Sequence, residues 1–546
     1  MRIRVNTLLT FFLLLVLFTS VQSFLHPLSV VEETLYHYEL FDLRGVVKGS
    51  IYLFTYLSAI LFFLLMLSLK STRVFCFFLL FIFLASSIDF FVQFLGVSHG
   101  FSLDEFRLSM HEIGNYEFLF AYSTTILKAL LLALLLVVVL FFIRQKIYKK
   151  RVSLGYLLLA LLPMSVVYGA CYKIDTFKLS SYPAMVKLPL IAVDYARTSS
   201  PIKERILAKN INAKNESSVE NIVWIIDESV TASYLSINGY AKKTTPYLEA
   251  LEKNSSLLSN FGIASSISNC SSTSNLFLRI GMSTQKEHNI AKEMFDMPTI
   301  FQYAQRAGYN TWLFDSQTQK DRLQNYLTLY DKKSIEHFET LNSSVKREEK
   351  DLELLKSVAK VTQGKGKNFI VVVKYGAHFP YLTTYDHAFS PFKPVLEGSF
   401  EGMTWENKEK QINTYLNSLH YTVDRYLKRV VETVDLENSV VFYTSDHGQN
   451  ILESKNLSRT HCNSANVVRN EVSVPLMVFS KNAKELFPVS REKFYSHIQI
   501  FPTTLELLGY DNEVVKKYGK SLKEGFEKSS DRAYILSSSL KKEKYK

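Results

Sequence analysis

Residues 440–450 read VVFYTSDHGQN, and the interpretation of the whole chain depends on this stretch. Its first half is a run of apolar and β-branched residues, which is typical of a buried strand. The run stops at Asp446, His447 and Gly448. Asp and Gly favour turns for backbone reasons, so a solvated turn is one interpretation. A carboxylate and an imidazole at the end of a strand are also possible zinc ligands, so a metal site is the other.

Strand-like and helix-like segments alternate on both sides of this stretch, from about residue 219 to the end of the chain. The expected strands are residues 221–227, 309–315, 368–376, 439–446 and 474–480. The expected helices are residues 245–254, 297–308, 349–363 and 411–435. Such alternation predicts an α/β domain with a mostly parallel sheet covered on both faces. Ligands of such sheets bind beyond the C-terminal ends of the strands.

Residues that can bind a metal follow three of the expected strands. Glu228 follows the first, His378 follows the third, and Asp446 with His447 follows the fourth. Glu228, Asp446 and His447 could give zinc three ligands and leave a fourth position open for chemistry. His378 and His461 could complete a second metal site or hold an anionic group.

A cluster of hydroxyl side chains occupies residues 267–275, ISNCSSTSN. It could be a Ser-rich turn, or it could carry a nucleophile. A hydroxyl is a weak nucleophile at its ordinary pKa, and coordination to zinc favours the alkoxide. A zinc site with an open position beside such a cluster would suit phosphoryl or sulfuryl transfer.

The first third of the chain holds five apolar stretches long enough to cross a bilayer, which takes about 20 residues. They are residues 7–24, 50–69, 74–96, 118–143 and 153–172. The Lys and Arg residues between them predict a cytoplasmic N-terminus and an outer location for everything after the fifth stretch. The first stretch could be a cleaved signal peptide, although we expect an uncleaved helix. The predicted organisation is a transmembrane domain (1–172), an interfacial linker (173–218) and an outer α/β domain (219–546).

The formal net charge of +12 suits an anionic membrane surface or an anionic substrate. Nucleic acid is not an expected partner, because the chain has no dense basic stripe with interleaved aromatic residues. The basic end of the chain, KKEKYK at residues 541–546, is interpreted as a solvated tail.

Four segments together resemble the membrane-bound phosphoethanolamine transferases of Gram-negative bacteria, within the alkaline phosphatase and sulfatase superfamily. They are DESVTASYLSINGYAKKTTPYLEAL (227–251), the hydroxyl cluster, GAHFPY (376–381) and YTSDHG (443–448). The resemblance implies a zinc enzyme of the bacterial inner membrane whose catalytic domain lies in the periplasm. It implies transfer of phosphoethanolamine from phosphatidylethanolamine to lipopolysaccharide, on a core sugar or lipid A, through a phospho-threonine intermediate. One or two zinc ions would fit.

The resemblance also implies roles for individual residues. The implied zinc ligands are Glu228, Thr273, Asp446 and His447. The side chains implied to contact the transferred phosphate are His378, His461 and Lys320. Thr273 is also the implied nucleophile, whereas counting four residues from Cys270, as in the lipid A enzymes, gives Ser274.

Some positions depart from the family pattern. Asp227 stands where the family usually has Gly, Gln449 where it often has Glu, and Val373 where the lipid A enzymes have an additional His. The missing His favours a core sugar as the acceptor. The HFP sequence at 378–380 is closer to lipoteichoic acid synthase and the glycerol phosphotransferases. Alternatives are therefore phosphoglycerol transfer from phosphatidylglycerol to a periplasmic glycan, and a non-catalytic membrane scaffold with the same fold.

The cysteines give one further expectation. Cys270 and Cys462 would lie in an oxidising compartment, where free thiols tend to pair. Cys270 is close to Thr273 in the chain, and Cys462 directly follows His461. We therefore expect a Cys270–Cys462 disulfide beside the site. Sulfatase activity is not expected, because Cys270 lacks the C-x-P-x-R context from which formylglycine is made.

Overall fold

The computed structural model describes most of the second half of the chain and part of the first. The described residues are 60–94, 123–147, 151–156, 204–215, 219–284, 290–318, 323–342, 344–398, 405–453, 460–463, 467–537 and 540–545, with single positions 50, 54, 57, 58, 188, 191 and 217. The chain divides into two compact units, Met1–Ser199 and Ser200–Lys546. Each unit is considered by itself.

The first unit contains the helices α4 (Thr72–Phe94) and α7 (Ser123–Phe142), the latter followed by a π-helical turn, Ile143–Ile147. Two segments, Thr72–Phe91 and Ser123–Gln145, are long and apolar enough to cross a membrane. They correspond to the third and fourth predicted spans. Residues 60–67 of the second predicted span are helical. The first predicted span and most of the fifth lie outside the described residues.

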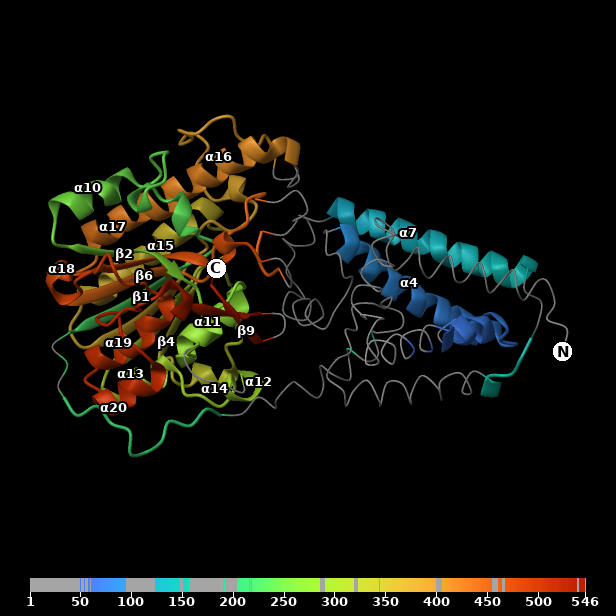
Figure 1. The fold of residues 1–546 in the computed structure, drawn as a ribbon, viewed down its shortest axis with the longest axis horizontal. Coiled ribbons are helices and arrows are strands. Elements are labelled where there is room, and N and C mark those ends of the chain that lie inside the picture. Colours follow the sequence, from blue (N-terminus) through green and yellow to red (C-terminus); the bar gives the residue numbers. More distant parts are fainter. Residues whose placement is uncertain are drawn as a thin grey trace. The chain divides into compact units, whose positions relative to one another are not determined.

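The second unit is built on a seven-stranded sheet with the strand order β2-β7-β6-β1-β5-β3-β4 (Figure 1). The strands are β1 (Asn221–Asp227), β2 (Leu258–Ser265), β3 (Asn310–Asp315), β4 (His337–Thr340), β5 (Asn368–Val373), β6 (Ser439–Ser445) and β7 (Ser473–Phe479). All five predicted strands are confirmed. The sheet is mixed, because β7 runs antiparallel to both of its neighbours, β6 and β2. A parallel return needs a long crossover, usually a helix, and the described residues between β6 and β7 contain no α-helix.

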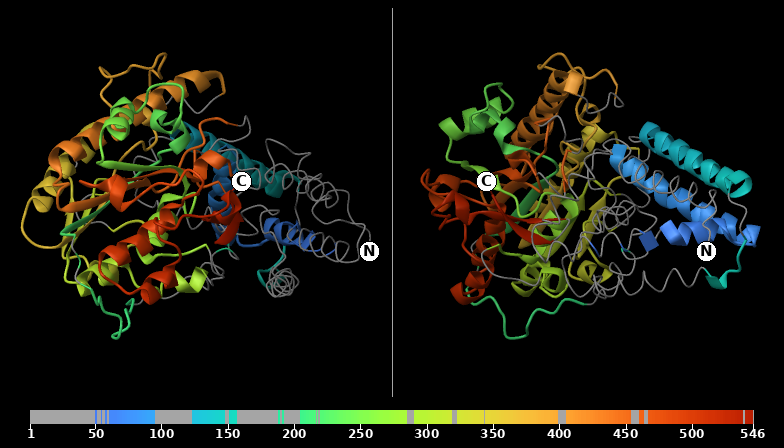
Figure 2. Two further views of the ribbon diagram at one scale, coloured as in Figure 1. Left: turned by 60° about the vertical axis from the view of Figure 1, so that its left-hand side comes forward. Right: turned by 45° about the vertical axis from the view of Figure 1, so that its right-hand side comes forward.

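Helices cover both faces of this sheet (Figures 1 and 2). The larger ones are α10 (Pro246–Asn254), α11 (Ser271–Ile280), α13 (Ile300–Arg306), α15 (Lys350–Thr362), α16 (Lys408–Leu419), α17 (Tyr426–Thr433) and α19 (Ile500–Leu507). The short ones are α12 (Ile290–Glu293), α14 (Leu329–Lys332), α18 (Ala483–Leu486) and α20 (Asn512–Val515). The predicted helices at 245–254, 297–308 and 349–363 correspond to α10, α13 and α15.

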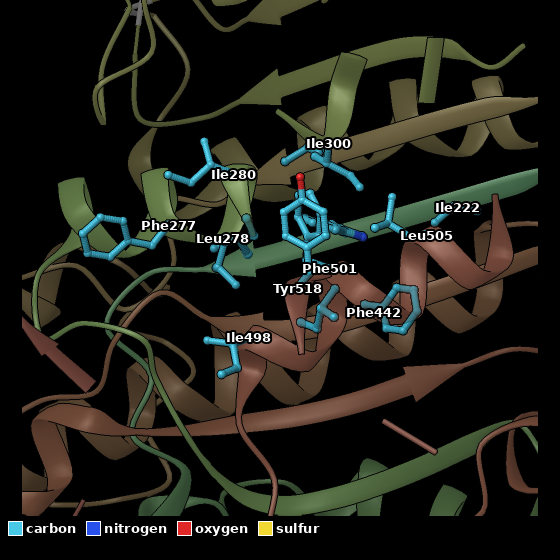
Figure 3. Close-up of a cluster of buried hydrophobic side chains, with 14 of the residues drawn as sticks. Ile222, Phe277, Leu278, Ile280, Ile300, Phe442, Ile498, Phe501, Leu505 and Tyr518 are labelled. Atoms are coloured by element: carbon cyan, nitrogen blue, oxygen red, sulfur yellow. The ribbon is translucent and has the colours of Figure 1, made fainter. Parts of the chain in front are cut away.

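The sheet is buried on both faces because alternate residues of each central strand enter different cores. In β1, Trp224 belongs to the core under α11, α13 and α19, which Figure 3 shows in part. The next residue, Ile225, belongs to the core under α15, α16 and α17. Side chains alternate between the two faces of a strand, so a strand covered on both faces is apolar throughout.

The helix predicted at 411–435 is interrupted in its middle. A π-helical segment, His420–Arg425, separates α16 from α17. Such a bulge releases backbone carbonyls from the regular helical ladder. The carbonyl of Thr422 accepts a hydrogen bond of 2.5 Å from the ammonium of Lys374.

Part of the predicted interfacial linker packs on the second unit. The guanidinium of Arg205 forms a buried ion pair of 2.7 Å with Asp331. The backbone N–H groups of Lys214 and Asn215 both donate to the carbonyl of Gly509. The described residues 204–215 of this linker therefore belong to the second unit.

The basic end of the chain forms a strand, so the prediction of a tail is wrong, although residues 541–544 are solvent-exposed as predicted. β8 (Ala533–Leu536) and β9 (Lys541–Lys544) form a two-stranded antiparallel sheet. Tyr545, directly after β9, is only 3% exposed. Its ring packs with Val472 and Tyr534, so burial of this aromatic ring fixes the end of the chain.

Candidate metal centre

Three buried side chains meet where two neighbouring strands end. β1 pairs in parallel with β6 so that Asp227 lies opposite Ser445, which places the residues after both strands side by side. Glu228 follows β1, and Asp446 with His447 follows β6. One ligand atom from each of these three lies within 4.8 Å of the others. Nε2 of His447 is 3.3 Å from Glu228 Oε1 and 3.7 Å from Asp446 Oδ2. We call these three residues the acidic triad.

The acidic triad concentrates negative charge in a buried place. Burial and the neighbouring Glu228 carboxylate raise the pKa of Asp446 well above its usual range. Burial alone would raise the pKa of Glu228, but the hydrogen bond and charge of His447 hold it well below its usual range. Burial would lower the pKa of His447, but the carboxylates of Asp446 and Glu228 raise it to about 9. Two carboxylates this close favour a cation between them.

The turn after β6 fixes the orientation of its two ligand residues. Asp446 Oδ1 accepts hydrogen bonds from the backbone N–H groups of His447 and Ser229. Nδ1 of His447 lies 2.7 Å from the carbonyl of Gly448, so Nδ1 carries a proton and Nε2 is the ring nitrogen that faces the carboxylates. A Cβ at Gly448 would lie 1.9 Å from the carbonyl oxygen of Asn470. The turn therefore requires glycine at this position.

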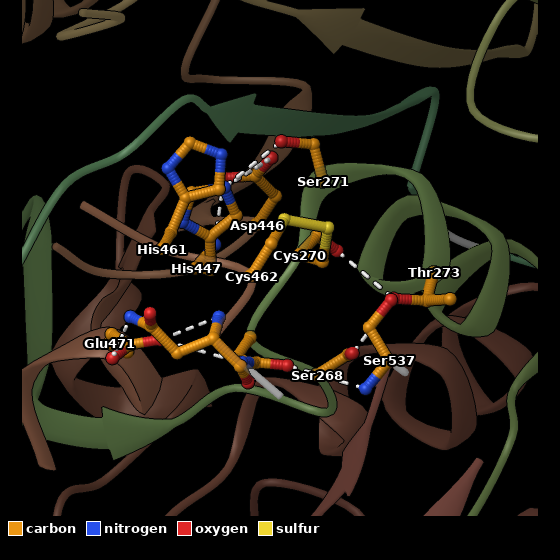
Figure 4. The surroundings of a disulfide bond; sticks show 12 residues. Ser268, Cys270, Ser271, Thr273, Asp446, His447, His461, Cys462, Glu471 and Ser537 are labelled. Carbon is orange, nitrogen blue, oxygen red and sulfur yellow. Dashed lines mark hydrogen bonds and ion pairs between the residues drawn. A yellow bond between two sulfur atoms is a disulfide. The ribbon is translucent and has the colours of Figure 1, made fainter. Parts of the chain in front are cut away.

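A serine hydroxyl faces the acidic triad. Ser271 Oγ lies 2.9 Å from Nε2 of His447 and 3.4 Å from Oε1 of Glu228 (Figure 4). Ser271 is the first residue of α11, where the unpaired N–H groups of a helix favour an anion. Sequence reasoning did not single out Ser271. The sequence carries no clear signal for it, because the letters of the hydroxyl cluster do not show which residue begins the helix.

The two hydroxyls that the sequence did single out have other partners. Thr273 Oγ1 lies 2.8 Å from Ser268 Oγ and 3.2 Å from the carbonyl of Cys270, which it faces in Figure 4. Thr273 is only 1% exposed. Ser274 Oγ donates a hydrogen bond of 2.5 Å to the backbone carbonyl of Asp446. Neither hydroxyl contacts the side chains of the acidic triad.

Two further histidines lie next to the acidic triad. The ring of His461 stacks on that of His447, with centroids 4.2 Å apart (Figure 4). His378 hydrogen-bonds through Nδ1 to the carbonyl of Phe379. Charges on both His378 and His461 help to lower the pKa of Glu228, so both lie within electrostatic range of its carboxylate. Lys320 lies outside the described residues, and its role stays a prediction.

Residues 220–510, more than half of the chain, match the sulfatase family. The chain belongs to the sulfatase family. It is 27% identical over 306 residues to a Kdo(2)-lipid A phosphoethanolamine 7''-transferase of Escherichia coli K12, covering 53% of this chain and 51% of that one. The chain thus spans about half the length of this curated relative. The resemblance to phosphoethanolamine transferases inferred from the motifs is confirmed by this relative.

Solved structures share the fold of this sulfatase-family chain. The integral membrane lipooligosaccharide phosphoethanolamine transferase A of Neisseria meningitidis has a TM-score of 0.56 at 19% identity, covering 93% of this chain and 96% of that one. The C-terminal periplasmic domain of EcEptC from Escherichia coli, in complex with Zn, has a TM-score of 0.51 at 19% identity. It covers 63% of this chain and 97% of that one.

The sulfatase-family site is braced by a disulfide, as the sequence predicted. Cys270 and Cys462 are bonded, with their Cα atoms 4.7 Å apart and a separation of 192 positions in the chain. The bond joins the residue before Ser271 to the residue after His461 (Figure 4). The N–H of Cys462 also donates to the carbonyl of Asn269. The disulfide therefore fixes the positions of Ser271 and His461 relative to each other.

Replacing both cysteines with alanine is expected to lower the free energy of unfolding of the second unit by about 2–4 kcal/mol, because the unfolded chain regains a long open loop. All three tryptophans (224, 312 and 405) lie in this unit. Tryptophan fluorescence during urea unfolding of the full-length protein in detergent therefore reports on this unit alone. Unchanged unfolding in the double variant would contradict a bracing role.

A buried ion-pair network lies directly behind the acidic triad. Lys374 and Asp227 are both fully buried, and the ammonium of Lys374 binds Asp227 Oδ2. Asp227 Oδ2 also accepts a hydrogen bond of 2.7 Å from the hydroxyl of Tyr443, and its Oδ1 accepts one of 2.9 Å from the N–H of Glu228. Burial raises the pKa of Asp227 to about 6 despite the charge of Lys374. We call Lys374, Asp227 and Asp351 the buried charge network.

Asp351 joins this network to the turn that carries His378. Its carboxylate lies 3.8 Å from the ammonium of Lys374 and accepts hydrogen bonds from the N–H groups of Tyr375 and Gly376. Gly376 has φ +55, and a Cβ there would lie 2.1 Å from Asp227 Oδ1. Glycine is therefore required at position 376 both by its φ and by the side chain of Asp227.

Two further side chains hold the site and were not predicted from the sequence. The amide of Gln317 donates to Glu228 Oε2 (3.1 Å) and to the carbonyl of Lys374 (2.7 Å). Nε2 of His497 accepts from the N–H of Ile267, and its Nδ1 lies 3.1 Å from the carbonyl of Ser445. Burial lowers the pKa of His497 to about 3, so this ring is neutral, as its acceptor role requires.

Proposed function

We propose that this sulfatase-family protein is a phosphoethanolamine transferase of the bacterial inner membrane, with its second unit in the periplasm. It would take phosphoethanolamine from phosphatidylethanolamine and pass it to lipopolysaccharide, on a core sugar or lipid A. The observation that carries the proposal is the hydroxyl of Ser271, 2.9 Å from Nε2 of His447 in a buried acidic triad. A relative named as a Kdo(2)-lipid A phosphoethanolamine transferase supports the choice of group and acceptor. Two helices apolar enough to cross a membrane suit a lipid donor.

The acidic triad fits zinc. Two carboxylates and an imidazole whose Nε2 faces them are ligands that zinc takes, and all three are buried. The related EcEptC domain is described as a complex with Zn. Glu228, Asp446 and His447 would hold the ion, which would polarise the phosphoryl group and favour the alkoxide of a neighbouring hydroxyl.

We assign the nucleophile to Ser271, in place of Thr273, because of where the two hydroxyls lie. In the first step, Ser271 Oγ would bond to phosphorus while the bond from phosphorus to the diacylglycerol oxygen breaks. The proton of Ser271 leaves, and the departing diacylglycerol oxygen takes one up. His461, stacked beside the triad, is suited to hold that proton.

In the second step a hydroxyl or phosphate oxygen of the acceptor would attack the phosphoserine. The bond to Ser271 Oγ then breaks, and Ser271 regains a proton as the acceptor loses one. The first N–H groups of α11 and the ring of His378 would offset charge on the phosphoryl oxygens in both steps.

Incubating the full-length protein with phosphatidylethanolamine is expected to leave a phosphoethanolamine adduct on Ser271, visible by mass spectrometry. After reduction of the Cys270–Cys462 disulfide, trypsin would release residues 254–279, which contain all three candidate hydroxyls, and fragmentation would locate the adduct. Protein stripped of metal by a chelator should form no adduct, and adding zinc back should restore adduct formation. An adduct on Thr273 would overturn the assignment of the nucleophile. An adduct formed only from phosphatidylglycerol would favour phosphoglycerol transfer, and no adduct from either lipid would favour a non-catalytic scaffold.

A further inference from the structure

The basic end of the chain is a fixed strand. All four residues of β9 are exposed, while β8 beside it is largely buried. The hydroxyl of Tyr545, directly after β9, lies 2.7 Å from Ser473 Oγ. The guanidinium of Arg532 lies 4.1 Å above the ring of Tyr545. Strand pairing along β9 and this aromatic anchor at its end present the lysines from a defined position.

This strand is attached to the segment that leads into Ser271. The N–H of Ile535, in β8, donates to the carbonyl of Ile267 at 2.7 Å. The N–H of Ser537 donates to Oδ1 of Asn269 at 3.3 Å, and Figure 4 shows Ser537 in the surroundings of the disulfide. β9 lies one strand spacing, about 5 Å, beyond β8. A molecule of saccharide size bound at Ser271 would therefore be within reach of β9.

β9 carries three lysines and one glutamate, Glu543, so its net charge is positive; Lys542 and Lys544 lie on one face of the strand, and Lys541 and Glu543 on the other. Lys541, Lys542 and Lys544 have no acidic group within 4 Å in the described part of the protein, unlike Lys481 and Lys493, which pair with glutamates. We call Lys541, Lys542 and Lys544 the lysine strand. Unpaired ammonium groups beside a reaction centre raise the local concentration of anionic ligands.

We propose that the lysine strand binds phosphate groups of a phosphorylated saccharide acceptor and holds that acceptor beside Ser271 for the second step. The inference rests on the proposed function, because it names how the acceptor of that reaction is recognised. The attachment of β8 to the catalytic segment favours the acceptor over a membrane surface as the ligand. Lysines on an edge strand also prevent pairing with other chains, but that role alone predicts no change in acceptor binding.

The test compares the full-length enzyme with the variant Lys541→Gln/Lys542→Gln/Lys544→Gln. The acceptors are purified lipopolysaccharide and the same material after removal of its phosphates. In the variant, the KM for the phosphorylated acceptor should be about tenfold higher than in the wild type at low salt. This is the size of effect expected from the loss of three exposed charge pairs. The difference should shrink at high salt and be absent with the dephosphorylated acceptor. Diacylglycerol release without acceptor should be unchanged, because the first step does not use the lysine strand.

A matched control is Lys253→Gln/Lys360→Gln/Lys365→Gln. These three lysines are also exposed, but they lie at the edge of the sheet where the parallel strands begin. The control should leave the KM of both acceptors unchanged. An unchanged acceptor KM in the lysine-strand variant, or an equal rise in the control, would overturn the inference. So would weaker binding to anionic vesicles with an unaltered acceptor KM, which would make the strand a membrane contact.

Failure of the proposed function gives a different result. Wild-type protein that releases no diacylglycerol and forms no adduct would contradict that function whatever the variants do. Binding of phosphorylated lipopolysaccharide, followed by tryptophan fluorescence, would then test the lysine strand directly. Equal affinity of the wild type and the lysine-strand variant in that titration would overturn the inference.

Discussion

Replacing Ser271 with alanine is expected to lower kcat/KM by ~10³-fold or more and to abolish the covalent adduct, because the variant has no oxygen at the attacking position. Ser271 is partly exposed, and among the described residues its hydroxyl has only His447 and Glu228 as hydrogen-bond partners, so the substitution should leave folding intact. The measurement is steady-state transfer together with mass spectrometry of residues 254–279. Thermal unfolding of the same preparations would verify that the variant is folded.

Neighbouring hydroxyls provide the controls for this prediction. Ser272 is also partly exposed and lies in the same helical turn, so Ser272→Ala should transfer at nearly the wild-type rate. Thr273→Ala removes a contact to Ser268 and should lower stability more than chemistry. A Thr273→Ala protein that is stable but inactive, beside an active Ser271→Ala protein, would contradict the assignment to Ser271.

The sequence alone does not determine which of these hydroxyls faces the acidic triad. Successive residues of an α-helix differ in direction by about 100°, so moving the helix start by one residue changes which hydroxyl faces the strand ends. The letters ISNCSSTSN do not indicate whether α11 begins at Ser271 or later. The acidic triad could be predicted, because the ends of parallel strands meet at one edge of a sheet and Glu228, Asp446 and His447 directly follow two such ends.

Local sequence patterns also predict only part of the fold, because some elements depend on contacts between distant parts of the chain. The central strands are continuous apolar runs and were predicted. β2 was missed because Gly262 and a register shift between Asn260 and Ile263 break its pattern. β4 was missed because it is only four residues long and partly exposed. Lys374 directly follows the apolar strand β5 and would be expected to reach solvent, and its burial depends on partners far away in the chain.

Replacing Lys374 with methionine, which has a similar shape and no charge, is expected to destabilise the second unit by about 3–5 kcal/mol. The substitution leaves the carboxylates of Asp227 and Asp351 without their cation, and it removes the donor to the carbonyl of Thr422. Urea unfolding of the full-length protein, followed by tryptophan fluorescence, would measure the change. Lys365→Met, at an exposed position before β5, is the matched control and should stay within about 0.5 kcal/mol of the wild type.

A second substitution tests whether Lys374→Met is destabilised by its unpaired carboxylates or by altered packing. Asp227→Asn added to Lys374→Met removes one of the two unpaired carboxylates and keeps an acceptor for the N–H of Glu228. The double variant should therefore be more stable than Lys374→Met alone, which is the sign of direct coupling between the two residues. If the double variant loses the sum of the two single losses, the two side chains act independently and the buried charge network is not what stabilises this region.

The network should also affect metal binding, because it holds the backbone on which the acidic triad is built. Asp227 bonds the N–H of Glu228 through its side chain, and its carbonyl accepts from the N–H of Asp446. Loss of Lys374 frees Asp227 to move, so the positions of both carboxylates loosen together. Partners that orient metal ligands are typically worth about 10–100-fold in affinity. We therefore expect Lys374→Met to bind zinc about 10–100-fold more weakly than the wild type, and Lys365→Met to bind it equally well. Competition with a chelator, under conditions where the protein is folded, would measure both affinities. Wild-type affinity in a destabilised Lys374→Met protein would show that the buried charge network supports the fold without orienting the acidic triad.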